Sequence, residues 1–125
     1  MPARSRSVLI VDDNDVMRTL LRAILRSDNQ FNVVGEARNG LAALEMVRRH
    51  QPEIVCLDVV MPEMDGLEAL REIRQLRPET QVVIITGTPS AGNVQEAMSL
   101  GANGFIIKPF NAAKILDTLA ALPRP

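Results

Sequence analysis

The sequence predicts an α/β fold in which a five-stranded parallel sheet carries helices on both faces. Five short apolar runs recur along the 125 residues, and helical patterns separate them. Several runs are apolar at consecutive positions, which is typical of strands covered on both faces. Regular alternation of strands and helices favours parallel strands joined by right-handed crossovers. A chain of this length suits one domain.

The expected elements follow one another without a long linker. The strands are Val8–Val11, Val33–Ala37, Ile54–Leu57, Val82–Ile85 and Phe105–Ile107. Apolar residues at helical spacing mark five helices: Met17, Leu20, Leu21, Ile24 and Leu25; Leu44 and Val47; Leu67, Leu70 and Ile73; Val94, Ala97 and Met98; and Ile115, Leu116, Leu119 and Leu122.

Polar residues that cap helices stand before three of these patterns. They are Asn39, Asp65 and Asn111. Each can accept a backbone N–H of the first turn, and Glu68, three residues after Asp65, completes the pattern of a capping box. Gly101 stands where the end of a helix favours a left-handed residue. Ser90 and Asn93 could both cap the fourth helix, so its start stays open.

The composition and the net charge limit the classes of protein to which the chain can belong. The chain is 46% hydrophobic but only 2% aromatic, so its core must be aliphatic. A net charge of −1 does not indicate a nucleic-acid surface, and we expect Arg4 and Arg6 to lie in a solvated tail. The lone Cys56 lies in an apolar run and is expected to be a buried thiol. No apolar run approaches the roughly 20 residues that span a bilayer, so we expect a cytoplasmic protein.

Acidic residues follow two of the expected strands. Asp12 and Asp13 come directly after the first strand and Asp58 after the third. Open parallel sheets bind ligands at the carboxyl ends of their strands, so neighbouring strands would bring three carboxylates together. Two such charges about 5 Å apart repel by roughly 3 kcal/mol at an effective dielectric near 20, unless a cation lies between them. Oxygen ligands favour Mg²⁺, or Mn²⁺, over Zn²⁺.

Two other strands end in residues with complementary chemistry. Thr86 provides a hydroxyl, and Gly87 after it lets the backbone come close. Lys108 emerges from an apolar strand with no acid beside it in sequence, so its ammonium group needs a partner in space. The carboxylates provide one, and a phosphoryl oxygen could be another. We therefore predict that Asp58 accepts a phosphoryl group.

With these motifs the sequence resembles the receiver domain of bacterial two-component response regulators. The resemblance covers roughly residues 7–122 and rests on Val11–Asn14, Leu57–Asp58, Met61–Gly66, Ile85–Gly87 and Ile107–Phe110. It implies a single receiver domain over residues 1–125. The implied fold is a flavodoxin-like, three-layer sandwich with strand order 2-1-3-4-5 and five helices.

The resemblance implies a role for each matching residue. Asp58 corresponds to the phosphoacceptor and is also a metal ligand, Asp13 corresponds to a direct metal ligand, and Asp12 to a second acid that often acts through water. The backbone carbonyl of Val60 would also bind the metal. The other matches are the switch residues Thr86 and Phe105, and Lys108, which would bind the phosphoryl group. The Lys108–Pro109 bond would be cis.

The resemblance also implies a signalling role. A sensor histidine kinase, a histidine phosphotransfer protein or a small phosphodonor would phosphorylate Asp58 with Mg²⁺. Thr86 would then move and Phe105 rotate inward, which would reshape the face formed by the helix near residues 94–98, the strand 105–107 and the last helix. That face would control a partner or an output domain outside this sequence, and it could form a homodimer. The domain would assist its own phosphorylation and dephosphorylation without being an enzyme.

Val60, two residues after Asp58, is apolar where many relatives carry a polar side chain. Thr88, two residues after Thr86, is at another variable position, and the two residues flank the expected path of the hydrolytic water. Because the apolar Val60 cannot orient water, we predict that the access of water mainly sets the lifetime of the phosphorylated form.

Other functions on a similar sheet fit less well. A haloacid-dehalogenase-type phosphatase would need an acid at Val60, and a flavodoxin would need a hydroxyl-rich loop where residues 12–15 hold three acids. No Gly-x-x-x-x-Gly-Lys loop is present. A pseudo-receiver that only docks stays open as the alternative, although the intact set of matched residues argues against it. His50 is expected to be a solvated helix end rather than a phosphotransfer group.

Overall fold

The computed structural model describes residues 5–62 and 64–124, and its sheet has the predicted topology. Five parallel strands pair in the order β2-β1-β3-β4-β5. They are β1 (Arg6–Val11), β2 (Phe31–Ala37), β3 (Ile54–Leu57), β4 (Gln81–Thr86) and β5 (Gly104–Ile107). The helices are α1 (Asp15–Arg26), α2 (Gly40–His50), α3 (Gly66–Leu76), α4 (Pro89–Gly92), α5 (Val94–Ser99) and α6 (Ala112–Ala120).

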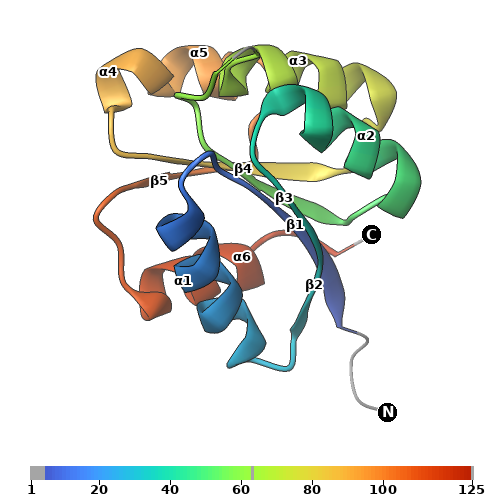
Figure 1. Ribbon diagram of the computed structural model, residues 1–125, viewed down its shortest axis with the longest axis vertical. Coiled ribbons are helices and arrows are strands. Elements are labelled where there is room, and N and C mark those ends of the chain that lie inside the picture. Colours follow the sequence, from blue (N-terminus) through green and yellow to red (C-terminus); the bar gives the residue numbers. More distant parts are fainter. Residues whose placement is uncertain (1–4, 63, 125) are drawn as a thin grey trace.

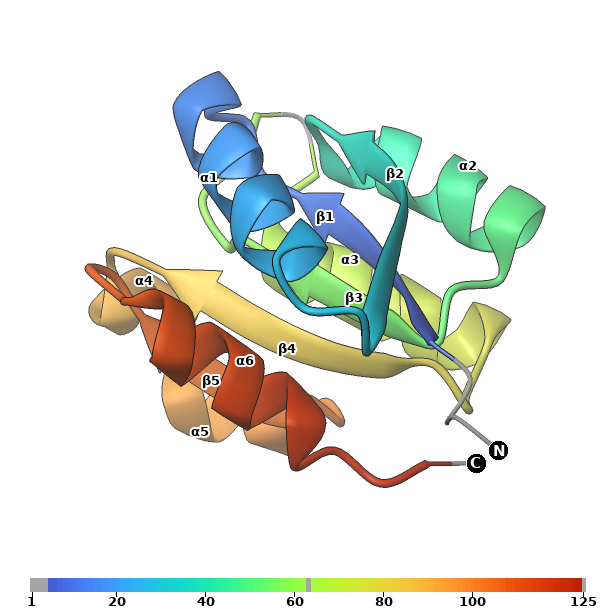
Figure 2. The same ribbon diagram turned by 90° about the horizontal axis from the view of Figure 1, so that it is seen from below.

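The helices form a layer on each face of the sheet. Figure 1 shows α2, α3, α4 and α5 on one face, with α1 and α6 on the other. The view from below in Figure 2 places α1 and α6 in front of the strands. This three-layer arrangement confirms the predicted fold. It leaves the carboxyl ends of all the parallel strands at one edge, between the two helical layers.

Two apolar cores lie between the layers because alternate strand residues point to opposite faces. One core joins β1, β3 and β4 to α2 and α3, through Leu9, Val55, Ile84, Val47 and Leu70 among others. The other joins the same strands to α1 and α6, through Ile10, Cys56, Ile85, Leu25 and Ile115 among others. Burial raises the pKa of the Cys56 thiol to about 12, so the thiol is protonated at neutral pH.

The predicted caps are confirmed. The side chains of Asn39, Asp65 and Asn111 each accept a backbone N–H in the first turn of α2, α3 and α6. Gly101 has a φ of 101°, in the region that favours glycine. Asn93 caps α5 by accepting the N–H of Glu96 at 2.9 Å.

The fourth predicted helix is two short helices rather than one. Asn93 has a φ of 31° and separates α4 from α5. Of the apolar stripe expected here, only Ala97 is buried, while Val94 and Met98 are 44% and 47% exposed. Leu20 in α1 is likewise 44% exposed, so it does not belong to the core stripe that the spacing predicted. These side chains lie on the outer surface, where periodicity alone cannot distinguish them from core residues.

The prediction that Arg6 belongs to a solvated tail is wrong. Arg6 begins β1 and is 2% exposed. Its guanidinium donates hydrogen bonds to the carbonyl oxygens of Leu122 at 2.9 Å and Pro123 at 2.7 Å, and lies 3.4 Å from a carboxylate oxygen of Glu53. Arg6 therefore binds the carbonyl groups just beyond α6 and ties the end of the chain to the sheet. Arg4, and Glu63 within the Met61–Gly66 motif, lie outside the described residues.

Replacing Arg6 by methionine should lower the free energy of unfolding by about 3 kcal/mol. The change removes charged hydrogen bonds and takes away the guanidinium donor of the Leu122 carbonyl, whereas the Pro123 carbonyl keeps its hydrogen bond from Gln81. Arg71→Met is the matched control because Arg71 lies exposed on α3, and we expect it to change stability by less than about 0.5 kcal/mol. Urea unfolding of both variants checks this, and equal small effects would show that the Arg6 contacts do not stabilise the fold.

Within residues 5–62 and 64–124, no helix has the length and apolar character needed to span a bilayer.

Candidate functional site

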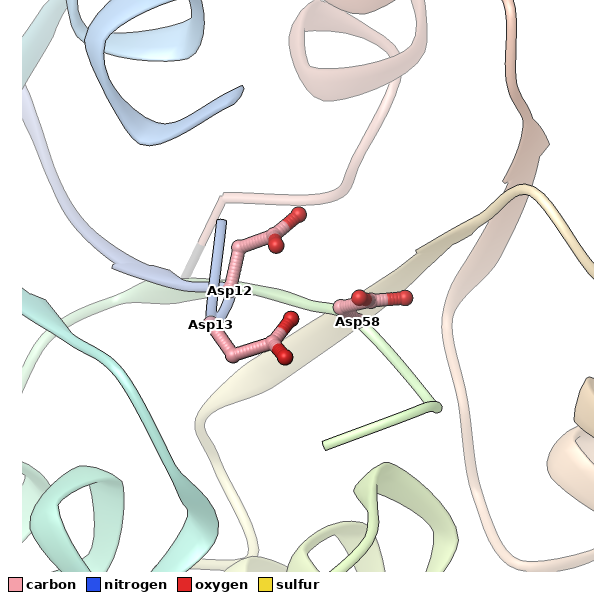
Figure 3. A group of neighbouring side chains, drawn as sticks. All are labelled: Asp12, Asp13 and Asp58. Carbon is pink, nitrogen blue, oxygen red and sulfur yellow. The ribbon is translucent and has the colours of Figure 1, made fainter. Parts of the chain in front are cut away.

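Strand pairing brings the three predicted acids together. Val11 pairs with Leu57 in the ladder between β1 and β3, and the residue after each strand is an aspartate. The N–H of Asp58 donates to the Val11 carbonyl at 2.9 Å, which continues this ladder by one step. Carboxylate oxygens of Asp12, Asp13 and Asp58 consequently lie within 4.8 Å of one another. Figure 3 shows the side chains of Asp12 and Asp13 extending from the end of β1 toward the side on which Asp58 lies.

Two of these carboxylates are buried. Asp12 and Asp58 are 2% and 7% exposed, whereas Asp13 is exposed. Burial raises the pKa of Asp58 from its ordinary 3.8 to about 6; the negative charge of Asp12 adds to the shift, and Lys108 opposes it. Negative charge at Asp58 is therefore costly in the protein alone, and a cation at this edge would lower that cost.

Asp12 is held at each of its polar groups. Its N–H donates to the Ala37 carbonyl at 3.1 Å, and its carboxylate accepts the N–H of Asn14 at 2.9 Å and the ammonium of Lys108 at 3.0 Å. Its own carbonyl accepts from Arg18 at 2.6 Å. Asp13, in contrast, has no hydrogen bond or ion pair with any of residues 5–62 and 64–124. Asp13 is thus the acid with the most freedom to bind a cation directly, and its role as a metal ligand stays a prediction.

The residues at this edge fit a small divalent cation. Octahedral Mg²⁺ holds its oxygens at about 2.1 Å, so neighbouring and opposite ligands lie roughly 3 to 4 Å apart. Oxygens within 4.8 Å need only small side-chain rotations to reach that spacing. The donor set is all carboxylate, which suits Mg²⁺ or Mn²⁺. Val60 is 52% exposed, and the role of its backbone carbonyl as a ligand stays a prediction.

Lys108 lies beside the acids, as the sequence predicted. Its side chain is 18% exposed, and its ammonium nitrogen lies 3.0 Å from an oxygen of Asp12 and 3.7 Å from Oδ2 of Asp58. The other oxygen of Asp58 accepts the N–H of Val59 at 2.8 Å. The two oxygens of Asp58 thus differ, because one accepts a backbone N–H and the other faces the Lys108 ammonium group. The Lys108–Pro109 peptide bond is cis, as expected.

Thr86 is the last residue of β4, and Phe105 lies within β5, where it pairs with Ile84. The Thr86 side chain is fully buried; its hydroxyl accepts the N–H of Thr88 at 3.1 Å, and its carbonyl accepts the N–H of Lys108 at 2.8 Å. Phe105 is half-buried, packs against the core under α2 and α3, and lines a surface hollow of about 640 Å³ with Ile107, Phe110 and others. Neither the hydrogen bonds of Thr86 nor those of Asp58 join the two residues, so their cooperation stays a prediction.

Gly66 shapes the loop that follows Asp58. Its N–H donates to the Val59 carbonyl at 2.7 Å, which brings the start of α3 against the end of β3. A Cβ at Gly66 would lie 2.2 Å from the Asp58 carbonyl oxygen. Only glycine therefore allows this packing. Gly87, which the sequence analysis singled out for close approach, is less constrained, because a Cβ there would lie 3.7 Å from the nearest atom of Lys108.

Three residues contribute to the site in ways that the sequence did not predict, although two of them, Asn14 and Gly66, lie in the motifs of the resemblance. Asn14 orients Asp12, Arg18 binds the Asp12 carbonyl, and Gly66 closes the loop after Asp58. The signal is Asp12 itself, because an aspartate side chain often accepts the backbone N–H two residues further on, which forms an Asx turn. Arg18 has no such signal, because it resembles any charged residue on an amphipathic helix.

In the metal-free protein, Asp58 should make stability fall with rising pH. Its folded-state pKa of about 6 exceeds the ordinary 3.8, so between these values the folded protein holds more protons than the unfolded chain. The favourable contribution is complete below about pH 4 and is lost as pH rises through 6, by about 2–3 kcal/mol in total. Urea unfolding in a chelator should show this slope in the wild type and not in Asp58→Asn; parallel pH profiles would contradict it.

Comparisons with known proteins agree on one family. The family model described as response regulator receiver domain matches residues 8–120. The chain is 45% identical to the chemotaxis protein CheY of Listeria monocytogenes, over 90% of this chain and 93% of that protein. It is also 44% identical to a protein-glutamate methylesterase/protein-glutamine glutaminase of Paramagnetospirillum magneticum, of which it covers 31%.

Solved structures of response regulators also match the chain. A CheX–CheY–BeF₃–Mg²⁺ complex from Borrelia burgdorferi matches with a TM-score of 0.88 and 32% identity, over 93% of this chain and 87% of that one. The signal receiver domain of NarL from Mycobacterium tuberculosis matches with a TM-score of 0.86 and 32% identity, over 94% and 95% of the two chains.

Proposed function

The chain belongs to the response regulator receiver domain family of two-component signalling, and we propose that phosphorylation of Asp58 switches it. The observation that carries the proposal is the position of Asp58 between two acids and an ammonium group. The Lys108 nitrogen lies 3.7 Å from its Oδ2, and carboxylate oxygens of Asp12 and Asp13 lie within 4.8 Å. We also propose that residues 1–125 act as one receiver unit. Members of this family are signalling domains rather than classical enzymes.

Asp58 is the nucleophile in the proposed reaction. Because Val59 binds Oδ1, the oxygen that attacks phosphorus is Oδ2, beside Lys108. A new O–P bond forms while the bond from phosphorus to the donor breaks, which for a phospho-histidine is a P–N bond. The leaving nitrogen keeps the electron pair and the imidazole takes a proton from solvent. Lys108 then donates to a phosphoryl oxygen, and its charge stabilises the negative charge that gathers there.

The acids at the end of β1 would hold Mg²⁺. Asp13 would bind it directly, Asp12 would act largely through water because Lys108 and Asn14 already occupy its oxygens, and Val60 would add its carbonyl. When bound, the ion supplies positive charge that offsets the acids and the phosphoryl oxygens. The Borrelia relative, whose complex contains Mg²⁺, supports this assignment.

The simplest test is the intact mass after incubation with a small phosphodonor. We expect the wild type to gain the mass of one phosphoryl group with Mg²⁺ and not with a chelator, and Asp58→Ala to gain none. An unmodified wild type would favour the alternative, a pseudo-receiver that only docks. An Asp58→Ala variant modified to the same extent as the wild type would place the phosphoryl group elsewhere.

The phosphoryl group would act on the face formed by α5, β5 and α6. Thr86 would leave Thr88 to bond a phosphoryl oxygen, and Phe105 would rotate into the space that opens. Exposed apolar residues already mark this face: Val94, Met98 and Ile107 are 44%, 47% and 50% exposed. We propose that it binds an output partner, an output domain or a second copy of the chain.

The donor would be a sensor histidine kinase or a histidine phosphotransfer protein in the cytoplasm. The family supports such a donor. A net charge of −1 does not indicate a nucleic-acid surface, so we propose that the domain does not bind nucleic acid directly.

Replacing Val60 by asparagine should change the lifetime of the phosphorylated form. The Val60 side chain is 52% exposed and cannot orient water, whereas an amide can donate to or accept from a water beside Asp58. We expect the hydrolysis rate to change by about threefold to tenfold, which corresponds to roughly 1 kcal/mol in the barrier. The decay of phosphorylated mass with time measures it, and identical decay in both proteins would refute the role of this position.

A further inference from the structure

Arg18 links α1 to the acids at the end of β1. Its side chain is 12% exposed, and its Nη1 donates to the Asp12 carbonyl oxygen at 2.6 Å. The same guanidinium hydrogen-bonds Asp15 and lies 3.5 Å from a carboxylate oxygen of Glu36. A fork with three partners in different directions fixes the guanidinium in place.

The carbonyl that Arg18 binds belongs to the peptide unit between Asp12 and Asp13. The orientation of that unit sets the direction in which the Asp13 side chain leaves the backbone. Asp12 has independent anchors at its N–H and at both carboxylate oxygens. Asp13 is exposed and has no hydrogen bond or ion pair within the described part of the chain, so its backbone alone places it.

Arg18 contributes orientation more than charge. Asp15 and Glu36 both contact its guanidinium, so its positive charge is largely balanced locally. Arg22 offers a useful comparison. It lies one turn further along α1 and binds Glu36 at 2.5 Å, but it has no contact with Asp12.

We propose that Arg18 is a positioning residue for the cation site, which holds the peptide unit between Asp12 and Asp13 so that the Asp13 carboxylate faces Asp58. This inference rests on the proposed function, in which Asp13 binds Mg²⁺ directly. Replacing the Arg18 guanidinium would let that peptide unit rotate. The affinity for Mg²⁺ would then fall, whereas the rate of phosphoryl transfer to Asp58 would change less.

The test compares Arg18→Met with Arg22→Met. Both substitutions remove one positive charge and one pairing with Glu36 from the same helix. Only the first also removes the bond to the Asp12 carbonyl and the pairing with the exposed Asp15. The protein has no Trp or Tyr, so Mg²⁺ binding is measured by calorimetry and by amide NMR shifts rather than by intrinsic fluorescence. We expect the dissociation constant for Mg²⁺ to rise about tenfold in Arg18→Met and to change less than twofold in Arg22→Met, with the largest amide shifts at Asp13.

Two further measurements separate positioning from folding. At saturating Mg²⁺, Arg18→Met should be phosphorylated at a rate within about threefold of the wild type, since Asp58 and Lys108 are untouched. Arg18→Lys keeps the charge without the fork and should bind Mg²⁺ as weakly as Arg18→Met does; it also serves if the methionine variant does not fold.

The outcomes distinguish this inference from the proposed function. Equal Mg²⁺ affinity in the wild type and Arg18→Met, or equal losses in Arg18→Met and Arg22→Met, would overturn the role of Arg18. A wild type that binds Mg²⁺ but takes no phosphoryl group would overturn the proposed function alone. A wild type that binds no Mg²⁺ would overturn both.

Discussion

Lys108→Met should slow phosphoryl transfer to Asp58 by about two to three orders of magnitude. The ammonium nitrogen lies 3.0 Å from Asp12 and 3.7 Å from Asp58, in a side chain that is only 18% exposed. A donor in such a position interacts strongly with charge that develops on the phosphoryl oxygens, because little water screens it. Methionine keeps an apolar stem of similar length, so the comparison isolates the ammonium group.

The same variant should bind Mg²⁺ at least as tightly as the wild type. Lys108 and the ion are both cations drawn to Asp12, so removing one relieves their repulsion. The initial rate of phosphoprotein formation at saturating Mg²⁺ and the dissociation constant from calorimetry test the two statements separately. Lys114→Met, on the exposed surface of α6, controls for loss of a positive charge. A Lys108→Met rate within threefold of the control would remove Lys108 from the mechanism.

Gly66→Ala should lower the stability of the protein and displace the Asp58 carboxylate. The added Cβ would lie 2.2 Å from the Asp58 carbonyl oxygen and 2.6 Å from the Cα of Val59. Both atoms belong to the backbone, so the whole loop after β3 must move. We expect the free energy of unfolding to fall by about 3 kcal/mol. Displacement of the carboxylate should slow phosphorylation on the order of 100-fold in the protein that remains folded.

Gly87→Ala provides the matched control at the same edge of the sheet. A Cβ there would lie 3.7 Å from the Lys108 side chain, an ordinary contact, so we expect little change in stability or rate. Urea unfolding and the initial phosphorylation rate measure both variants. If Gly66→Ala changes stability and rate as little as Gly87→Ala, the loop after β3 can move more easily than its backbone contacts indicate.

The strands and the acids were predictable because both follow from short-range rules. A strand buried on two faces is apolar at nearly every position, as Ile54–Leu57 shows. Parallel strands bring their carboxyl ends to one edge, so residues that directly follow neighbouring strands must meet. Asp12 and Asp58 were found in this way, although they are 46 positions apart in the chain. Lys108 follows β5, which is not next to β3, and it was placed beside the acids because its ammonium group needs a partner.

What the sequence could not reveal depends on partners that are distant or on backbone geometry. Arg6 was placed wrongly because the carbonyls that it binds lie 116 and 117 residues away. The break at Asn93 depends on a positive φ that several residue types adopt only in context. Gly66 is one of seven glycines, and nothing in its local sequence shows that the Asp58 carbonyl oxygen lies against its Cα.

Chemical trapping of the modified residue tests the central claim most directly. Borohydride reduces an aspartyl phosphate to homoserine, and trypsin would separate residues 7–18, which include Asp12 and Asp13, from residues 50–71, which include Asp58. After incubation with a small phosphodonor and Mg²⁺, fragmentation of the second peptide should place homoserine at position 58 alone. Homoserine at position 12, 13 or 65, or a phosphorylated protein that yields none, would contradict the assignment of Asp58 as the phosphoacceptor.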